Sequence, residues 1–394
     1  MRQIYIGRSM VISLSTAIWI GLVLRIIIAI WNSFFGPSPG ADMDALTFHF
    51  EAVANSLDFS WYNIQFTNGK LYTHLLGAIY YFLIDSIFLG SLLSCLAWLL
   101  SALILSRVMV ILSASKAASV KAMLIYSLLP SSIFLTGATL REPYQMLFVS
   151  IVTLSVLQIY LHRSTVHRFV LIFGLAGLST LHGTLFLFAV VVLMMLLIFL
   201  IFRPQRSLSI RTIVLFIVFG ALILYFGLSL FIKFSYGFGD DFYKTLTHYN
   251  QIFLSTSARG TYVTPIVLSD MIDFLIFLPN NFFQYLAEPL PWHVTAFKDL
   301  PLLVENMVRL NLICVASFRL LVASSLDRRP VLLVFFLYLI LEGMWSLGTG
   351  NWGTAARHHL PSLGLLLVAA FALSGRTFSK RNYRKQSSYN SASK

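Results

Sequence analysis

The chain has 394 residues, of which 58% are hydrophobic and only 11% are charged. Soluble domains usually carry roughly 25% charged residues, so this chain has too little polar surface to cover a water-soluble globule, in keeping with its mean hydropathy of +0.81. Composition excludes a soluble enzyme, a disordered regulator and a secreted disulfide scaffold, and it predicts an all-α polytopic membrane protein. Cys95 and Cys314 both lie in apolar runs and offer neither a disulfide framework nor a cysteine metal site.

Ten apolar stretches are long enough to cross a bilayer, which takes ~20 residues each. They lie at residues 9–31, 87–112, 120–140, 144–161, 169–184, 185–202, 212–232, 302–324, 330–347 and 360–375. The first stretch is too long for a signal-peptide core and lacks a convincing small-residue cleavage site, so we expect it to be retained as a span. Ten spans place both termini on the same side of the membrane.

The distribution of charge supports this count and accounts for the net charge of +13. Nineteen of the 28 Lys and Arg residues fall at the ends and loops of one side, together with a single acidic residue, Asp327. Thirteen of the 15 acidic residues fall on the other side, and Glu342 lies within a span. By the positive-inside rule, the basic side is cytoplasmic. The basic excess is thus a topology signal rather than a nucleic-acid footprint, and we predict a multi-pass protein of the inner or plasma membrane with both termini in the cytoplasm.

We predict a single transmembrane catalytic domain over residues 1–375 and a basic, Ser- and Asn-rich tail over 376–394 that is expected to be disordered. Two long outer loops, 32–86 and 233–301, belong to the domain. Their apolar segments are broken or flanked by polar residues and prolines, and counting either one alone as a span would invert every later loop. We interpret these segments as lying on or dipping into the outer membrane face, as does a nearby helical stripe. The segments are 71–84 and 268–288, and the stripe is 45–58.

Four polar clusters map to the predicted outer side. They are Gly40–Asp44, Leu140–Pro143, the polar residues Asp240, Asp241, Arg259 and Glu288 to His293 of the long loop 233–301, and Asn351–His359. Carboxylates and fixed cations therefore converge on one boundary between water and membrane. That arrangement suits chemistry on a lipid-anchored anionic substrate.

The order of these clusters resembles that of the GT-C glycosyltransferases, integral membrane enzymes that take sugars from polyprenyl carriers. An acidic motif in a long first outer loop, followed by an amphipathic segment, is the pattern of the family. The segment from Leu128-Leu129-Pro130 to Leu140-Arg141-Glu142 resembles the end of the third span in its bacterial polysaccharide branch, which we compare with the polyprenyl-phosphate-sugar-dependent mannosyltransferases (the PMT-like group). Asn351-Trp352-Gly353-Thr354, with Arg357 and Pro361, is similar to the last-loop signature. The resemblance implies a GT-C-like fold with about ten transmembrane helices and juxtamembrane helices on the outer face.

Cations are expected to bind the phosphate of the donor. A polyprenyl phosphate is a good leaving group, so its departure requires positive charge to hold the developing phosphate charge rather than a strong acid. Arg357 and Arg141 are the fixed cations best placed for this role, and His358 and His359 would act as hydrogen-bond donors.

A carboxylate is expected to take the proton of the acceptor hydroxyl, which is a poor nucleophile at neutral pH. Asp44 is the first candidate and Asp42 the second. Many relatives carry an adjacent Asp-Glu pair where this chain has Asp42-Met43-Asp44, so either aspartate could match the family's base. A single-step displacement with one base would invert the anomeric centre. Supporting roles fall to Glu142, Asn351 and Glu342, the last because a carboxylate within a span is a functional candidate by default.

Several of these residues also have a plainer interpretation. Asp44 could be the N-cap of the helix that follows it, and Asp42 with Asp44 could bind a divalent ion. We favour no metal, and no tightly bound organic cofactor is implied. Arg141 and Glu142 could pair with each other across a turn, and Arg25 in the first span is expected to snorkel toward the outer surface.

The sequence thus predicts a hexosyl- or pentosyltransferase that moves a sugar from a polyprenyl-phosphate-linked donor to a hydroxyl of a glycan or glycolipid at the outer face, in polysaccharide biosynthesis. Its partners would be the lipid-linked donor, the acceptor and the bilayer, with no nucleic acid. The alternative enzyme is an O-antigen-type polymerase or ligase, which relies on arginine and histidine of later outer loops and would leave Asp42 and Asp44 dispensable. A lipid-linked glycan flippase or transporter usually shows internal repeats, and the sequence shows none.

Overall fold

The computed structural model describes residues 12–63, 70–202, 244, 247–248, 250–251, 254, 260–263, 267–323 and 325–374. Within these ranges the regular elements are helices, apart from one isolated antiparallel bridge between Thr261 and Asn351. The predicted span 212–232 and tail 376–394 lie outside the described residues. So do Asp240, Asp241, Arg259 and the side chain of Asp42.

Helices lie at nine of the ten predicted spans. They are α1 (Leu14–Phe34), α4 (Ile87–Ile111), α5 (Lys116–Leu128) with α6 (Pro130–Thr136), α7 (Glu142–His162), α8 (Thr165–Leu181), α9 (Gly183–Phe202), α13 (Leu300–Val322), α14 (Ser325–Ser346) and α16 (Leu360–Phe371). By length and apolar composition, five helices of the described chain could each cross a membrane, or six if the bent pair α5–α6 is one span, and α8, α9 and α16 are shorter apolar helices. The chain is a helical membrane protein, and ten spans stay a prediction.

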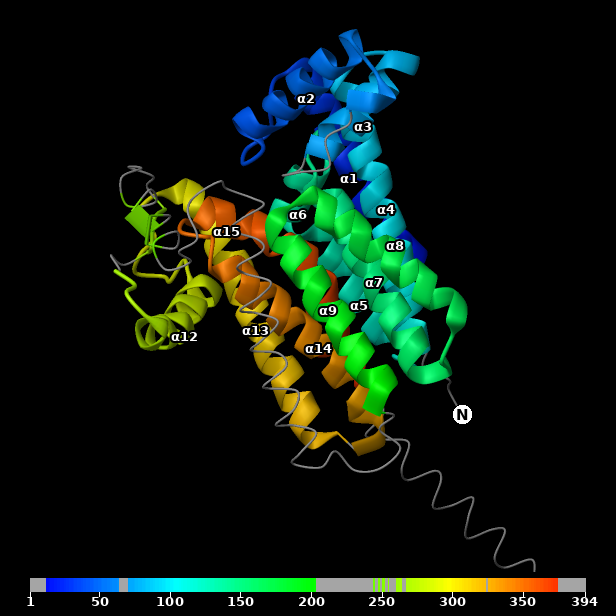
Figure 1. The fold of residues 1–394 in the computed structure, drawn as a ribbon, viewed down its shortest axis with the longest axis vertical. Coiled ribbons are helices and arrows are strands. Elements are labelled where there is room, and N and C mark those ends of the chain that lie inside the picture. Colours follow the sequence, from blue (N-terminus) through cyan, green and yellow to red (C-terminus); the bar gives the residue numbers. More distant parts are fainter. Residues whose placement is uncertain are drawn as a thin grey trace, which may run out of the picture.

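Three segments predicted to lie at the outer face also form helices: α2 (Asp42–Leu57), α3 (Lys70–Phe82) and α12 (Met271–Ala287). None of these three is long and apolar enough to be a candidate span. Helices α2 and α3 pack against each other beyond one end of the bundle, where α3 also contacts α8 (Figure 1). The close approach of α3 to α2 requires glycine at position 77, because a Cβ atom there would lie 2.8 Å from the carbonyl oxygen of Ala52.

Helix α16 forms the centre of the bundle and fixes the last loop. All eleven residues from Leu360 to Ala370 are buried, as expected for a helix that is apolar on every side. It packs against α14, α7, α13 and α5. The short helix α15 (Trp352–His358) leads directly into its N-terminus, so packing of α16 positions the polar residues 357–359. Short 3-10 turns at Trp61–Asn63 and Phe297–Asp299 complete the described elements.

The third predicted span is broken. Helix α5 ends at Leu128, Pro130 begins α6, and the two axes differ in direction by 59°. Proline cannot donate a backbone hydrogen bond and disfavours the helical conformation in the residue before it, which here is the extended Leu129. The break leaves carbonyl groups at the end of α5 without helical partners.

Arg25 of α1 lies at this break, and the prediction that its side chain snorkels toward the outer surface is wrong. Its side chain is fully buried instead of snorkelling, and its guanidinium lies 3.6 Å from the centroid of the Trp98 ring. It donates hydrogen bonds to the carbonyl oxygens of Gly21 (2.8 Å) and Ser127 (3.0 Å) and to the hydroxyls of Ser132 (2.7 Å) and Thr136 (2.6 Å). A cation at a helix C-terminus is electrostatically favourable, so Arg25 stabilises the bend between α5 and α6.

Candidate functional site

Residues from three of the four predicted polar clusters meet in the structure. Arg357 of α15 donates from Nε and Nη2 to Glu142 Oε1 at 2.9 and 2.6 Å. It also donates from Nη1 to Asp44 Oδ2 on α2. These three residues, called the arginine–carboxylate cluster below, join segments that are 215 and 313 residues apart in the chain. The fold thus brings two of the predicted carboxylates, Asp44 and Glu142, to the predicted cation Arg357.

Helix ends explain why these side chains take these positions. Glu142 is the first residue of α7 and is followed by Pro143, an arrangement favoured because proline fits the first turn and the helix dipole attracts a carboxylate there. Arg357 lies in the last turn of α15, where a cation is favoured. Asp44 lies in the first turn of α2, whose N-cap residue is Ala41. The interpretation of Asp44 as the N-cap is therefore wrong.

The two carboxylates of the cluster differ in exposure. Glu142 is 4% exposed, whereas 55% of the Asp44 side chain is exposed. Burial acts to lower the pKa of Arg357, but Glu142 and Asp44 outweigh it and raise that pKa above its ordinary value. Arg357 is thus held as a cation between one buried and one accessible carboxylate. The second oxygen of Glu142, Oε2, is buried without a hydrogen-bond partner in the described chain.

Arg141 lies beside the cluster but does not form the predicted pair with its neighbour. Its Nη1 donates to the carbonyl oxygen of Leu181 at 3.1 Å, and its guanidinium lies 5.3 Å from the centroid of the Phe48 ring on α2. Burial lowers the pKa of Arg141, with Glu142 acting in the opposite direction. Glu142 pairs with Arg357 instead, so the interpretation of an Arg141–Glu142 pair closing the turn is wrong. Arg141 ties α2 and α8 to the start of α7.

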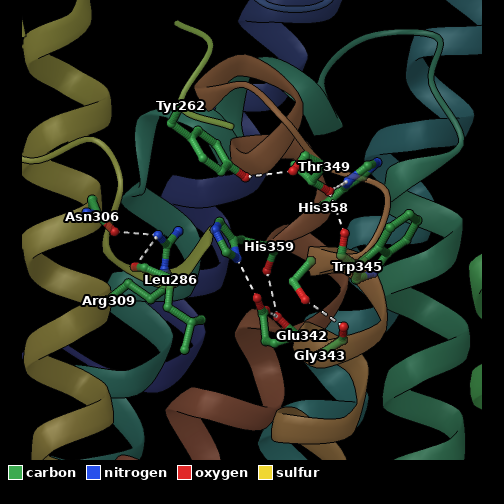
Figure 2. Close-up of polar contacts among 12 residues, drawn as sticks. Tyr262, Leu286, Asn306, Arg309, Glu342, Gly343, Trp345, Thr349, His358 and His359 are labelled. Carbon is green, nitrogen blue, oxygen red and sulfur yellow. Dashed lines mark hydrogen bonds and ion pairs between the residues drawn. The ribbon is translucent and has the colours of Figure 1, made fainter. Parts of the chain in front are cut away.

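His358 packs against Trp345 and Thr349. Its ring stacks on Trp345 at a centroid distance of 3.9 Å, and its Nδ1 lies 2.6 Å from the hydroxyl of Thr349 (Figure 2). His182, which lies between α8 and α9, contacts the same Trp345 ring at 4.6 Å. Burial, followed by the charges of neighbouring groups, lowers the pKa of His358 well below its ordinary value. The His358 ring is neutral at pH 7, and its predicted role at the donor phosphate stays a prediction.

His359 and Glu342 form a separate buried pair. His359 Nδ1 lies 2.6 Å from Glu342 Oε2 (Figure 2). The hydroxyl of Ser362 donates to the other carboxylate oxygen. Burial and the charge of Arg309 lower the pKa of His359 to about 4, although Glu342 acts in the opposite direction. A neutral ring that donates from Nδ1 presents Nε2 as a hydrogen-bond acceptor. That Nε2 is buried and has no partner in the described chain.

A pocket opens beside this pair, between α6, α13, α14 and the α15–α16 junction. It contains about 540 Å³ of empty space, part of which is open to solvent. The polar residues of its wall are Ser131, Glu288, Glu305, Asn306, Arg309, Tyr338, Trp352, His359 and Ser362, and its apolar residues include Leu129, Leu302, Leu360, Leu363 and Leu366.

Asn306 and Arg309 are pocket residues that the sequence patterns did not single out. Asn306 donates to the carbonyl oxygens of Ala287 and, at 3.2 Å, Pro289. Arg309 donates to Asn306 Oδ1 and, at 3.2 Å, to the carbonyl oxygen of Leu286. Both residues lie within the predicted span 302–324, and polar residues inside a span mark functional positions. That rule, applied to Glu342, would have found them as well.

Asn351 has a positional role. Its side chain caps α15 by accepting the backbone N–H of Thr354 at 2.8 Å. The neighbouring backbone pairs with residues 260–262, through Tyr262 N to Gly350 O (3.1 Å) and Trp352 N to Gly260 O (3.0 Å). Asn351 therefore fixes the start of the helix that carries Arg357. No group of three or more His, Cys, Asp and Glu side chains in the described chain is arranged to hold a metal ion.

Comparison with known proteins gives no family for this chain. No family model matches it, and it has no match among curated proteins or among solved structures. The geometry of the site is therefore the basis on which a function can be proposed.

Proposed function

We propose that this chain is a membrane glycosyltransferase that transfers a sugar from a polyprenyl-phosphate-linked donor to a hydroxyl of a glycan or glycolipid. The observation that carries the proposal is the meeting of Asp44, Glu142 and Arg357. Transfer of a sugar from a phosphate to a hydroxyl needs one group to take the proton of the hydroxyl and one to stabilise the negative charge on the departing phosphate. The cluster supplies an accessible carboxylate and a fixed cation at one place.

In the proposed reaction, the acceptor hydroxyl oxygen forms a bond to the anomeric carbon as the bond from that carbon to the phosphate oxygen breaks. The hydroxyl proton passes to Asp44, and Arg357 stabilises the charge on the released polyprenyl phosphate. The displacement inverts the anomeric configuration. Asp44 suits the role of base because it is the exposed carboxylate of the cluster, whereas the buried Glu142 orients Arg357. Asp42 stays the second candidate for the base.

The proposal includes a GT-C-like architecture with ten spans and the cluster on the periplasmic or outer face. Nucleotide sugars are made in the cytoplasm, so an outer-face site is better supplied by a lipid-linked donor. The charge bias of the loops supports this orientation.

The alternative function is an O-antigen-type polymerase or ligase. The His359–Glu342 pair and Arg309 favour it, because they form a polar site in the later part of the chain that does not contact Asp44. In that enzyme, substitution of Asp44 would leave activity intact.

Sugar transfer by the purified chain in detergent tests the proposal, with a panel of polyprenyl-phosphate sugars as donors. We expect Asp44→Asn and Arg357→Ala each to lower the rate by at least about 100-fold. Asp42→Asn tests the second candidate for the base. Asp58→Asn, at the other end of α2 and exposed, is the matched control and should retain activity. A chelator should have no effect.

Transfer that is indifferent to both Asp42 and Asp44 would overturn the assignment of the base and favour the polymerase or ligase. No transfer from any lipid-linked donor would overturn the proposal as a whole.

A further inference from the structure

The two carboxylates of the arginine–carboxylate cluster bind different edges of the Arg357 guanidinium. A guanidinium can bind an oxyanion along the edge formed by Nε and Nη2 or along the edge formed by Nη1 and Nη2. In Arg357, Nε and Nη2 donate to Glu142 Oε1 at 2.9 and 2.6 Å, and Nη1 donates to Asp44 Oδ2. Glu142 is buried, whereas 55% of the Asp44 side chain is exposed. An anion that arrives from solvent therefore meets Arg357 at the edge that Asp44 binds.

The formal charges of the cluster cancel while Asp44 is bound. Arg141 belongs to the same set of charges, because Arg357 and Asp44 both act on its pKa. Two guanidinium groups then face the carboxylates of Asp44 and Glu142, and an added phosphate would meet no net positive charge. If Asp44 leaves Arg357, two cations remain beside one carboxylate, and their excess charge attracts an oxyanion. Exchange of Asp44 for a phosphate is thus favoured over the addition of a phosphate to the complete cluster.

Asp44 can leave Arg357 by rotation of its own side chain. Because the side chain is exposed, other rotamers are open to it without movement of α2. Asp44 lies in the first turn of α2, where the helix dipole favours a negative charge. The released carboxylate is therefore still stabilised. Glu142 has no such freedom, since it is 4% exposed, and it holds Arg357 in place throughout the exchange.

Apolar side chains beside the cluster favour a phosphate that is carried by a lipid. Met43, next to Asp44, is 72% exposed. Phe34 and Phe35, where the chain leaves α1 toward α2, are 74% and 73% exposed. Exposed apolar side chains that gather in one segment mark contact with a membrane or an apolar ligand. A prenyl chain can cover them, whereas inorganic phosphate cannot.

We propose that Asp44 and the phosphate of a polyprenyl lipid compete for Arg357, and that binding of the phosphate releases Asp44. The carboxylate is then free to accept the hydroxyl proton only when the donor phosphate is in place. The inference rests on the proposed function and adds regulation of its site. A fixed tether between α2 and the last loop is the competing interpretation of the Asp44–Arg357 pair, and it predicts no gain in phosphate affinity when Asp44 is replaced.

Titration calorimetry of the full chain in an uncharged maltoside detergent tests the competition, with farnesyl phosphate as the probe. Farnesol lacks the phosphate, and inorganic phosphate lacks the prenyl chain. We expect Asp44→Asn to bind farnesyl phosphate about fivefold more tightly than the unsubstituted chain, because an exposed ion pair no longer has to be broken. The affinity for farnesol should be unchanged by the substitution. Inorganic phosphate should bind at least about tenfold more weakly than farnesyl phosphate.

Asp58→Asn is the matched control, because it removes the same charge from an exposed position at the other end of α2. Its affinity for farnesyl phosphate should equal that of the unsubstituted chain. Arg357→Gln should weaken farnesyl phosphate binding at least about tenfold, and Asp44→Asn added to it should bring no gain. If Arg357→Gln does not fold, the comparison of Asp44→Asn with Asp58→Asn still decides, because both substituted side chains are exposed.

An affinity for farnesyl phosphate that is unchanged or weaker in Asp44→Asn would overturn the inference. So would an equal gain in Asp58→Asn or a gain in the affinity for farnesol. Inorganic phosphate that binds as tightly as farnesyl phosphate would overturn the assignment to a lipid. Tighter binding in Asp44→Asn without transfer from any donor would support the competition and count against the proposed function. Loss of transfer without tighter binding would leave Asp44 as the base and exclude the competition.

Discussion

Glu142 and Arg357 are joined by two hydrogen bonds, of 2.9 and 2.6 Å, although 215 residues separate them in the chain. Glu142 begins α7, and Arg357 lies in the last turn of α15. The pair therefore connects the start of α7 to the last loop.

Substitution of Arg357 is expected to destabilise the fold. In Arg357→Ala, the buried carboxylate of Glu142 loses its partner, and breaking a buried ion pair in this way typically costs about 3 kcal/mol or more. The double variant Arg357→Ala with Glu142→Gln should recover part of that loss, because the uncompensated charge is removed. Chemical unfolding in detergent measures both.

The second carboxylate of the cluster provides the comparison. Since 55% of the Asp44 side chain is exposed, Asp44→Asn should change stability by less than about 1 kcal/mol. Equal losses in Asp44→Asn and Arg357→Ala would show that the bond to Glu142 is not what stabilises the loop.

Acid is expected to destabilise the protein through the buried His359. Burial, followed by the charge of Arg309, lowers the pKa of His359 from 6.5 to about 4. Because the unfolded chain binds this proton more readily, the contribution of His359 to stability is complete above about pH 6.5 and is lost as pH falls from 6.5 toward 4. Stability should change by up to about 1.4 kcal/mol per pH unit in that window.

Unfolding measured between pH 7.5 and 5.5 (a range set by about one unit on either side of the ordinary histidine pKa) tests this dependence. His359→Asn should lower the slope of stability against pH. The exposed His162 serves as the control, and His162→Asn should leave the slope unchanged. A slope unaffected by His359→Asn would contradict the prediction.

Arg25 is expected to be sensitive even to a change that keeps its charge. Lysine lacks the planar fork that reaches four acceptors around the α5–α6 break, so Arg25→Lys should cost about 3 kcal/mol through unpaired buried groups. Arg107 on α4 is exposed, and Arg107→Lys should stay within about 0.5 kcal/mol. Thermal unfolding of the two variants measures both losses of stability. Equal unfolding midpoints would contradict the role given to Arg25.

Gly77 is expected to control the position of the helix that carries Asp44. In Gly77→Ala, the new Cβ would lie 2.8 Å from Ala52 O and from Asn55 Cβ, so α2 must move away from α3 at a cost of about 1–3 kcal/mol. Gly343 of α14 has nothing within 4 Å of its Cβ position, so Gly343→Ala should stabilise the protein by up to about 1 kcal/mol. Destabilisation of similar size in both variants would show that packing at Gly77 is not the cause.

The predicted orientation can be tested by labelling single cysteines with a membrane-impermeant thiol reagent. Met43 on α2 and Thr165 at the start of α8 are both exposed. In a Cys314→Ser background, Met43→Cys should react in intact cells, and Thr165→Cys should react only after permeabilisation. The reverse pattern would invert the topology and place the arginine–carboxylate cluster on the cytoplasmic side.

Much of the secondary structure could be predicted from the sequence, because hydropathy and helical period are local properties of the chain. They located helices at nine predicted spans and at α2, α3 and α12. The charges of the loops likewise assign Asp44, Glu142 and Arg357 to the same predicted side of the membrane. Hydrophobic periodicity predicts helices, and loop charge predicts the side of the membrane. Both patterns can be read from stretches of neighbouring residues.

Tertiary structure alone decided which polar groups pair. Glu142 binds Arg357 and not its neighbour Arg141, and Arg25 is buried at a helix break. Adjacent residues of a helix point about 100° apart, so 357, 358 and 359 face a carboxylate pair, an aromatic stack and a pocket. Which partner each one meets depends on how distant helices rotate and pack against one another, and no stretch of neighbouring residues contains that information.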